Sequence, residues 1–285
     1  MILIVDSGAT KSDWIALDED GNKLFVTKTL GLSPEVLTSE IINERLANNF
    51  ELYKHRKEVT QLYFYGAGCG TERMRKFLKG IFADYFPNAK TSVKEDTYAA
   101  IYATVEPDQH AIVCILGTGS NCSYWDGKEL FQKVTSLGYI LMDDCSGNYF
   151  GRQLIRDYYY HKIPEKLAVK FASEYDLEED SVKNHLYKQP NPNTYLATFA
   201  RFVIQNKDEE YCQSLIKKGM QLFISNSITQ FEQAKEVPIH FIGSIAYYLQ
   251  DELKQTLSEN GLSIGKVLRR PIDGLVDYHK SVLFD

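Results

Sequence analysis

The sequence predicts an α/β fold made of two copies of one unit, and three observations support this. The length of 285 residues suffices for two domains of ordinary size. Apolar segments of strand length alternate with segments of helical periodicity over roughly the first hundred residues. The order of elements then begins again at Ala111, where AIVCILGTGSNCSYWDGKELFQKV parallels IVDSGATKSDWIALDEDGNKLFV near the N-terminus.

Both segments contain the same pattern of strands and turns. Each has an apolar strand, a turn rich in Gly, Ser and Thr, a second strand, an Asp-Gly turn and a third strand. In the first copy we expect strands at 2–5, 14–17, 24–30, 61–65 and 90–94, and helices at 35–53, 72–85 and 96–104. The segment 35–53 is predicted as one helix because Leu37, Ile41, Ile42, Leu46 and Phe50 recur at helical spacing.

The second copy holds a mostly helical insertion, expected at 146–233. A strand at 239–242, a helix at 245–258, a strand at 266–268 and a last helix at 273–284 follow it. We expect the boundary between the copies near Glu106 to His110. The predicted domains are therefore residues 1–107, with the C-terminal helix 271–285 packing back on them, and residues 108–270.

The composition is that of a globular protein and disfavours several classes of partner. The net charge of −6 matches neither duplex nucleic acid nor an anionic membrane surface. The opening MILIVD reaches a charged residue too early for a signal peptide, and no apolar run approaches the length of a membrane span. Five dispersed Cys without a C-x-x-C pair disfavour a disulfide framework or a zinc ribbon. We expect a cytoplasmic protein with no nucleic-acid and no membrane partner.

The turn of the first copy, DSGATK, offers groups that suit a metal ion and phosphate. Asp6 ends an apolar strand and supplies a carboxylate, while Gly8, Thr10 and Lys11 supply a backbone N–H, a hydroxyl and an ammonium group. A plain hairpin turn is the alternative explanation.

The matching turn of the second copy is LGTGSN. Gly117 and Gly119 allow close approach of the backbone to an anion, and Thr118 and Ser120 add hydroxyl groups. The dinucleotide fingerprint G-x-G-x-x-G lacks its third Gly, and the motif G-x-x-x-x-G-K-[ST] is missing from the chain. The turn therefore favours a phosphate site of another kind.

Two further segments join a strand to a helix. In FIGSIA, Gly243 and Ser244 allow close approach either of a flat ligand group or of a neighbouring strand. YGAGCGTE, at 65–72, is a Gly-rich turn.

Carboxylates stand at two strand ends. Asp96 follows a strand and opens a helix, so it either caps that helix or accepts a proton from a substrate hydroxyl. Asp143 and Asp144, in GYILMDDCSG, lie between an apolar strand and a helix opened by Ser146. Helix capping, contact with a metal-bound water and contact with a sugar hydroxyl are all open for this pair. The six His are isolated from one another, which disfavours a zinc enzyme.

Together these motifs resemble the sugar kinase, heat-shock protein 70 and actin superfamily, and more closely the BadF/BadG/BcrA/BcrD ATPase family with its N-acetylglucosamine kinase members. DSGATKSDW is similar to the first phosphate motif, LGTGSNC to the second and FIGSIA to the adenosine motif. The resemblance implies two RNase H-like (actin-like ATPase) domains with an interdomain cleft. It implies ATP-dependent phosphorylation of an amino sugar, foremost N-acetylglucosamine to its 6-phosphate, with ATP and Mg²⁺ as cofactors and a homodimer as one assembly.

The resemblance also implies roles for the individual residues. Asp6 would hold Mg²⁺ through water, and Asp96 would be the catalytic base. Asn121 and Asp143 would orient the sugar, and Gly243 and Ser244 would lie by the adenosine. The groups around the ATP phosphates would be Gly8, Thr10, Lys11, Gly117, Thr118, Gly119 and Ser120.

The chain departs from the family pattern in its sugar-binding segments. The loop 31–36 lacks the expected Asn, Ser136-Leu137-Gly138 replaces G-W-G, and 142–146 replaces G-D-E-G-S. These changes leave the identity of the sugar open. The alternatives are an activator ATPase for a 2-hydroxyacyl-CoA dehydratase or benzoyl-CoA reductase, whose iron–sulfur cluster needs paired Cys, and a sugar- or ATP-binding sensor without catalysis.

Overall fold

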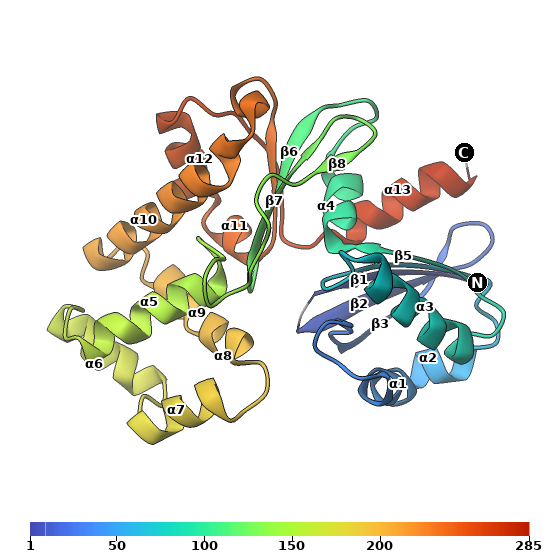
Figure 1. Ribbon diagram of the computed structural model, residues 1–285, viewed down its shortest axis with the longest axis horizontal. Helices are drawn as coiled ribbons and strands as arrows, with labels where there is room; N and C mark the ends of the chain where they lie inside the picture. Colours follow the sequence, from blue (N-terminus) through green and yellow to red (C-terminus); the bar gives the residue numbers. More distant parts are fainter. Residues whose placement is uncertain (9, 285) are drawn as a thin grey trace. The chain divides into compact units, whose positions relative to one another are not determined.

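The computed structural model describes residues 1–8 and 10–284, and the chain divides into two compact units. Unit 1 comprises Met1–Glu106 and Arg270–Asp285, and unit 2 comprises Pro107–Arg269. In the described residues each unit contains one five-stranded sheet flanked by helices (Figure 1). This α/β architecture confirms the predicted fold class.

The sheet of unit 1 has the strand order β3-β2-β1-β4-β5. The first three strands are antiparallel, and β4 and β5 run parallel to β1. The strands are β1 (Ile2–Ser7), β2 (Lys11–Leu17), β3 (Lys23–Leu30), β4 (Gln61–Gly66) and β5 (Lys90–Glu95). The helices are α1 (Ser39–Ala47), α2 (Phe50–His55), α3 (Glu72–Tyr85), α4 (Asp96–Thr104) and α13 (Ile272–Phe284).

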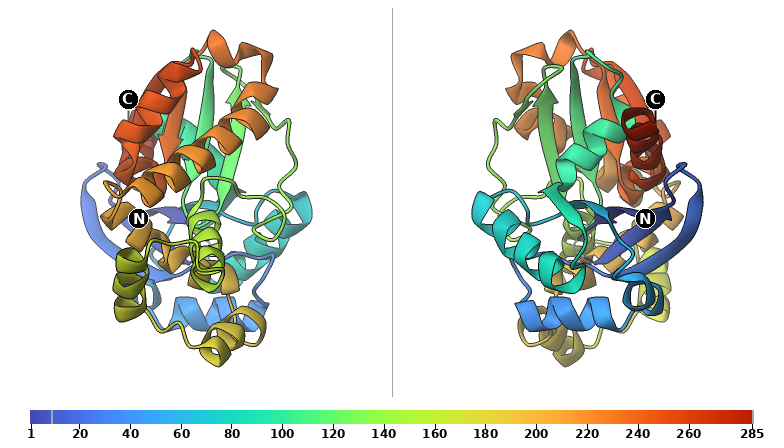
Figure 2. Two further views of the ribbon diagram at one scale, coloured as in Figure 1. Left: turned by 90° about the vertical axis from the view of Figure 1, so that its left-hand side faces the viewer. Right: turned by 90° about the vertical axis from the view of Figure 1, so that its right-hand side faces the viewer.

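Strand β1 is buried on both faces, because its alternate residues enter two different cores. Leu3 and Val5 pack with residues of α1, α2 and α3. Ile2 and Ile4 pack with residues of α4 and α13. The C-terminal helix α13 lies alongside α4 on this second face (Figure 2). The central strand and its following turn are thereby held between two helical layers.

The prediction of one helix over 35–53 is wrong, because the structure has two shorter helices there. Thr38 caps α1, its side chain accepting from the Ile41 backbone N–H at 3.5 Å. Asn49 caps α2 by accepting from the Leu52 N–H at 3.1 Å. A side-chain acceptor of this kind starts a new helix where the apolar spacing alone predicts continuation.

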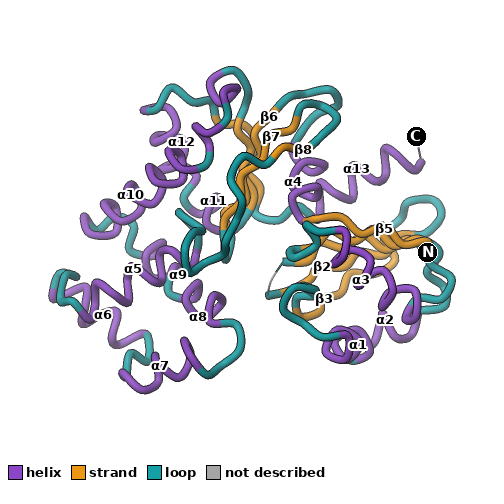
Figure 3. The backbone as a smooth tube through the Cα atoms, viewed as in Figure 1, coloured by secondary structure: helices purple, strands orange, loops and turns teal. Residues whose placement is uncertain are grey.

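The sheet of unit 2 has the order β10-β9-β6-β7-β8. Its strands are β6 (Ala111–Leu116), β7 (Ser120–Trp125), β8 (Leu130–Phe131), β9 (Ile239–Ile242) and β10 (Ile264–Leu268). Between β8 and β9, Figure 3 shows helices, turns and loops. These helices are α5 (Gly147–Tyr159), α6 (Glu165–Glu174), α7 (Glu179–Tyr187), α8 (Pro192–Thr198), α9 (Ala200–Gln205), α10 (Glu210–Asn226) and two short 3-10 helices, η1 (Ile228–Gln230) and η2 (Glu232–Lys235).

Two further predictions in unit 2 are wrong. The helix expected at 245–258 is divided at Leu249 into α11 (Ser244–Tyr248) and α12 (Gln250–Glu259). The apolar run before Asp143 forms turns instead of a strand. The Arg152 guanidinium donates to the carbonyl oxygens of Tyr139 and Ile140, at 2.6 and 3.0 Å, so these groups bond a side chain and not a neighbouring strand.

Across the residues that the structure describes, no helix combines the length and the apolar character needed to cross a membrane.

Candidate active site

The first candidate turn joins β1 to β2 in unit 1. The two strands form an antiparallel hairpin in which Asp6 lies directly opposite Asp13. The Gly8 N–H donates to the Lys11 carbonyl at 2.9 Å and closes the base of the turn. Thr10 lies exposed within the turn, and Lys11 begins β2. The predicted residues of this motif therefore lie together at one end of the hairpin.

The carboxyl group of Asp6 is half-buried at the end of β1. Burial, together with the neighbouring carboxylates of Asp96 and Asp13, raises its pKa to about 7, against the opposing charges of Lys11 and Arg270. A nearby cation stabilises the ionised form of such a carboxyl group, because it offsets both the cost of burying the charge and the repulsion by the other acids.

The donor set at this hairpin fits Mg²⁺. Mg²⁺ is usually held by one or two carboxylates together with waters and substrate phosphates, and not by a cage made wholly of protein groups. Asp6 offers a carboxylate beside a phosphate-type turn. In the part of the chain that the structure describes, no group of three or more His, Cys, Asp or Glu is arranged to hold a metal ion.

Asp13 and Arg270 belong to this region and were not predicted from the sequence. The Asp13 side chain is 4% exposed, and it lies 3.3 Å from Lys11 Nζ, 3.7 Å from Lys28 Nζ and 3.4 Å from Arg270 Nη1. The hairpin register, with Asp13 opposite Asp6, is the signal that could have indicated Asp13. Nothing local indicates Arg270, because 257 positions separate it from Asp13 in the chain.

Asp96 is the first residue of α4 and directly follows β5. Its carboxyl group accepts hydrogen bonds from its own backbone N–H and from that of Thr97, which favour the ionised form. Burial and the charge of Glu95 outweigh these bonds and raise its pKa to about 7. A base whose pKa lies near neutral pH is well matched to accept a proton from a hydroxyl during reaction.

Two loops of unit 1 approach each other near Asp96. A Cβ at Gly68, whose φ is +79°, would lie 2.4 Å from Ser33 Oγ, so the Gly-rich loop after β4 packs closely on the loop 31–36. A Cβ at Gly70 would lie 3.6 Å from the Glu95 carboxylate. The loop that resembles the family's sugar-binding segment and the Gly-rich loop therefore pack together, and the Gly-rich loop reaches the residue that precedes Asp96.

The second candidate turn joins β6 to β7 in unit 2. The Gly117 N–H donates to the Gly119 carbonyl at 3.0 Å within the turn. The carbonyl oxygens of Gly117 and Thr118 accept from the N–H groups of Gly147 and Asn148, at 2.8 and 3.0 Å, so the start of α5 fixes the turn. Ser120 and Asn121 are half-buried at the start of β7.

Gly243 supports this turn from the neighbouring strand. Its φ is +120°, and a Cβ there would lie 2.2 Å from the Leu116 carbonyl oxygen. Of the two explanations for this glycine, close approach of a neighbouring strand is the one that the contact indicates. Ser244 follows, exposed, as the first residue of α11.

Asp143 lies against the same turn in unit 2. Its backbone is left-handed, with φ +68°, and its Oδ2 accepts from Asn148 Nδ2 at 3.0 Å. A Cβ at Gly119 would lie 2.7 Å from that oxygen. By contrast, the Asp144 carboxylate accepts from Asn226 Nδ2 at 2.9 Å, on α10. The structure thus brings Asp143 to the turn, and adds Asn148 as a residue missed in the sequence.

The capping interpretation of the acidic pair does not hold, because Ser146 caps α5. Its Oγ accepts from the Tyr149 N–H at 3.2 Å. It also donates to the Asp143 carbonyl at 2.6 Å. Asp143 is therefore left with a side chain that orients toward the turn through Asn148.

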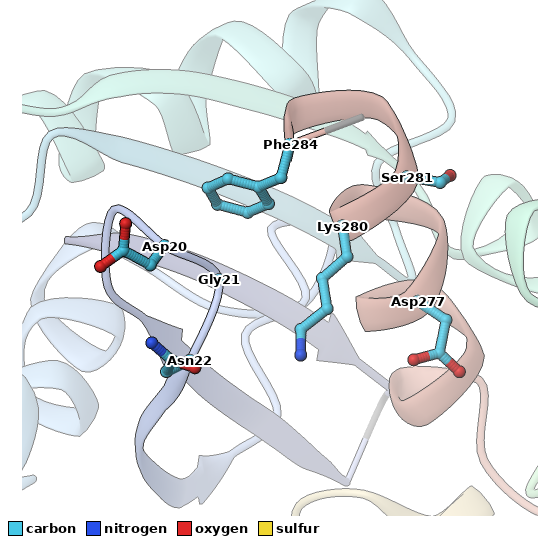
Figure 4. Close-up of a pocket in the computed structure, with 7 residues that line it drawn as sticks. All are labelled: Asp20, Gly21, Asn22, Asp277, Lys280, Ser281 and Phe284. Carbon is cyan, nitrogen blue, oxygen red and sulfur yellow. The ribbon is translucent and has the colours of Figure 1, made fainter.

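The pocket in Figure 4 holds none of the predicted site residues. It lies in unit 1 between the β2–β3 turn and α13, lined by Asp20, Gly21, Asn22, Asp277, Lys280, Ser281 and Phe284. The β2–β3 turn is at the opposite end of β2 from the β1–β2 turn.

Among the comparisons with known proteins, only the one with solved structures finds matches. No family model matches the chain, and no curated protein matches it in sequence. Among solved structures, a Porphyromonas gingivalis protein described as a "putative N-acetylglucosamine kinase" is 33% identical, with a TM-score of 0.91 and coverage of 99% of both chains. A Chromobacterium violaceum protein of the same description is 14% identical, with a TM-score of 0.70 and coverage of 97% of this chain and 98% of that chain.

A third similar structure is a ROK family glucokinase from Streptomyces griseus in complex with glucose and AMPPNP. It is 13% identical, with a TM-score of 0.61 and coverage of 97% of both chains. The likeness to it and to the Chromobacterium violaceum protein shows a shared fold. The likeness to the Porphyromonas gingivalis protein extends to the sequence over nearly the whole chain.

Proposed function

The chain belongs to the N-acetylglucosamine kinase-like sugar kinases of the BadF/BadG/BcrA/BcrD family, within the actin-like ATPase superfamily, and we propose that it phosphorylates an amino sugar, foremost N-acetylglucosamine at its 6-hydroxyl. The observation that carries this proposal is the 33% identity to the Porphyromonas gingivalis protein over 99% of both chains. The placement of two high-pKa carboxyl groups in unit 1 supports it. The reaction converts ATP and the sugar to ADP and the sugar 6-phosphate.

In this mechanism Asp96 is the catalytic base. To catalyse phosphoryl transfer, a protein must mainly position the two substrates in line and neutralise charge on the transferring phosphate. As the sugar oxygen attacks the γ-phosphorus, the Asp96 carboxylate accepts the hydroxyl proton. The pKa of about 7 makes Asp96 basic enough to take the proton while part of the population stays ionised at neutral pH.

The two glycine turns are assigned to the nucleotide. In unit 1 the ligands would be Gly8, Thr10 and Lys11, through a backbone N–H, a hydroxyl and an ammonium group. In unit 2 the turn 117–120 would bind phosphate oxygens, and the α5 start that fixes this turn would keep it preorganised. Asp6 would hold Mg²⁺, which when bound neutralises charge on the transferring phosphate.

The sugar and adenosine contacts complete the proposal. Asn121 and Asp143 would orient the sugar, Asp143 being fixed for this by its bond from Asn148. Gly243 and Ser244 would lie by the adenosine. The loop 31–36, which lacks the family's Asn, is the segment in which a different sugar preference would originate.

An ADP-release assay over a panel of sugars tests the proposal. The panel is N-acetylglucosamine, glucosamine, N-acetylmuramic acid and glucose, each compared with ATP alone. We expect ADP release to rise at least tenfold with an amino sugar over the rate with ATP alone, since a positioned hydroxyl outcompetes water. Equal release with and without every sugar would contradict the proposal, and binding of ATP or sugar without any turnover would indicate a sensor.

The activator ATPase alternative is disfavoured by the cysteines. All five are buried. Cys114 and Cys122 lie 3.6 Å apart across β6 and β7 inside unit 2, with 0% and 7% exposure, where a second subunit has no access to them. A cluster shared between two subunits needs cysteines at the surface.

A further inference from the structure

Asp13 is the centre of an ion cluster in which one carboxylate has three cationic partners instead of one. One buried carboxylate faces three cationic groups, Lys11 Nζ at 3.3 Å, Arg270 Nη1 at 3.4 Å and Lys28 Nζ at 3.7 Å. The carboxylate is 4% exposed, whereas the three cationic side chains are 39–60% exposed. The cluster therefore presents positive charge outward from a buried anchor.

Two of the three cations act on Asp6 as well as on Asp13. Asp13 is directly opposite Asp6 in the hairpin, and Lys11 and Arg270 are among the charges that stabilise the Asp6 carboxylate. Lys28 lies on β3, the edge strand, which β2 separates from β1. Lys11 begins β2 next to the phosphate-type turn, Arg270 acts on both acids, and Lys28 lies opposite Asp13 on the strand farther from Asp6.

We propose that Asp13 is a positioning residue that holds Lys11 and Arg270 beside Asp6, and that Arg270 is a further ligand of the ATP phosphates. The inference rests on the proposed function, which places polyphosphate at this hairpin. A guanidinium group suits both tasks, because its planar fork binds a carboxylate through one nitrogen while its other N–H groups face a phosphate. Arg270 directs Nη1 at Asp13.

Three explanations of the cluster predict different results for Asp13→Asn. If Asp13 positions the cations, the variant binds ATP more weakly, because Lys11 and Arg270 repel one another and move apart. If Asp13 acts only by its charge, the variant binds ATP more tightly, because a negative charge near the phosphates is removed. If the cluster is only structural, thermal stability falls and ATP binding does not change.

The experiment compares Arg270→Gln and Asp13→Asn with Lys28→Met as the matched control, since all three changes remove one member of the cluster. The measurements are the Kd of Mg·AMPPNP by calorimetry, KM for ATP, kcat and thermal unfolding. We expect Kd and KM to rise about tenfold or more in Arg270→Gln and Asp13→Asn, which is the effect of losing one charge-assisted hydrogen bond. The kcat of both variants should stay within about threefold of the wild-type value. Lys28→Met should stay within about twofold.

The double variant Asp13→Asn/Arg270→Gln tests whether Asp13 acts through Arg270. Its loss of affinity should be smaller than the product of the two single losses, because the two residues act in one interaction. If Asp13→Asn does not fold, the nucleotide affinity of Arg270→Gln alone decides whether Arg270 is a ligand of the ATP phosphates. Wild-type affinity in a folded Arg270→Gln variant, or an equal loss in Lys28→Met, overturns the assignment.

The binding measurement separates this inference from the proposed function. A wild-type protein that binds Mg·AMPPNP but phosphorylates no sugar overturns the proposed sugar phosphorylation, while the Arg270→Gln result still decides the role of Arg270. A wild-type protein that binds no nucleotide overturns both.

Discussion

Replacement of Asp96 by Asn is expected to lower catalysis and raise stability at the same time. The pKa of Asp96 rises from its ordinary value of 3.8 to about 7 in the folded protein. A difference of that size corresponds to an unfavourable free energy of about 4 kcal/mol for the ionised group. Because the side chain is only partly buried, solvent screening reduces the expected gain of the variant to about 1–2 kcal/mol.

The pH dependence of this gain follows from the direction of the pKa change. Below about pH 4 the carboxyl group is neutral in both the folded and the unfolded chain, so Asp96→Asn gains nothing. Between pH 4 and pH 7 only the unfolded chain ionises readily, so the wild type loses stability relative to the variant. Above about pH 7 the difference is constant.

The assays are sugar-dependent turnover, Mg·AMPPNP binding and thermal unfolding at pH 5 and pH 8. We expect kcat to fall by about 10²–10⁴-fold, the usual worth of general base catalysis, with nucleotide affinity unchanged. The melting temperature should rise by a few degrees at pH 8 and by less at pH 5. Full kinase activity in Asp96→Asn would refute the assignment and direct attention to Asp143.

Three further predictions test other parts of the site. Asp6→Asn should raise the Mg²⁺ concentration for half-maximal activity by about tenfold or more, measured by Mg²⁺ titration, because the lost charge acts on the metal; an unchanged titration would remove Asp6 from that role. For the wild type, kcat/KM for the sugar should fall about tenfold per pH unit below about pH 7, as Asp96 becomes protonated and can no longer accept a proton; a rate independent of pH from 5 to 8 would contradict this. Gly243→Ala should destabilise the protein by about 3 kcal/mol in urea unfolding, because the added Cβ would lie 2.2 Å from the Leu116 carbonyl oxygen and φ is +120°. The control Gly80→Ala, in open space on α3, should be neutral or stabilising. Equal effects of the two substitutions would contradict the claim that the close approach at Gly243 requires glycine.

Local patterns account for the elements that the sequence predicted well. The helices at 72–85 and 96–104 and the strand at 239–242 begin and end as expected, since each has a clear apolar period between turn residues. The repeat of the hairpin in the two copies likewise follows from strand and turn signals within about 25 residues. The placement of Asp96 at a strand end and helix start was predictable for the same reason.

Features that depend on capping or on side-chain partners were not predictable in this way. The segment 35–53 has helical spacing throughout, yet the acceptor of Asn49 starts a second helix. The run 138–142 has the composition of a strand, yet it forms turns in which Arg152 bonds the carbonyls of Tyr139 and Ile140. The side chains of Ile140 and Leu141 are about 70% exposed. Apolar periodicity carries no information on either interaction.

Distant contacts account for the rest of the candidate site. Arg270 reaches Asp13 across nearly the whole sequence. The bond from Asn148 to Asp143 joins residues only five positions apart, but it forms where the Asp143 backbone is left-handed, which the sequence pattern does not indicate. The raised pKa values of Asp6 and Asp96 come mainly from burial, which exists only once the chain is packed.

Transfer of the γ-phosphate label from ATP to N-acetylglucosamine tests the central claim most directly. We expect the wild-type protein to place one labelled phosphate on the 6-oxygen of the sugar for each ADP formed, and Asp96→Asn to place at least about a hundredfold less in the same time. Label recovered only as inorganic phosphate, at the same rate with and without the sugar, would contradict the claim that this protein is an amino-sugar kinase.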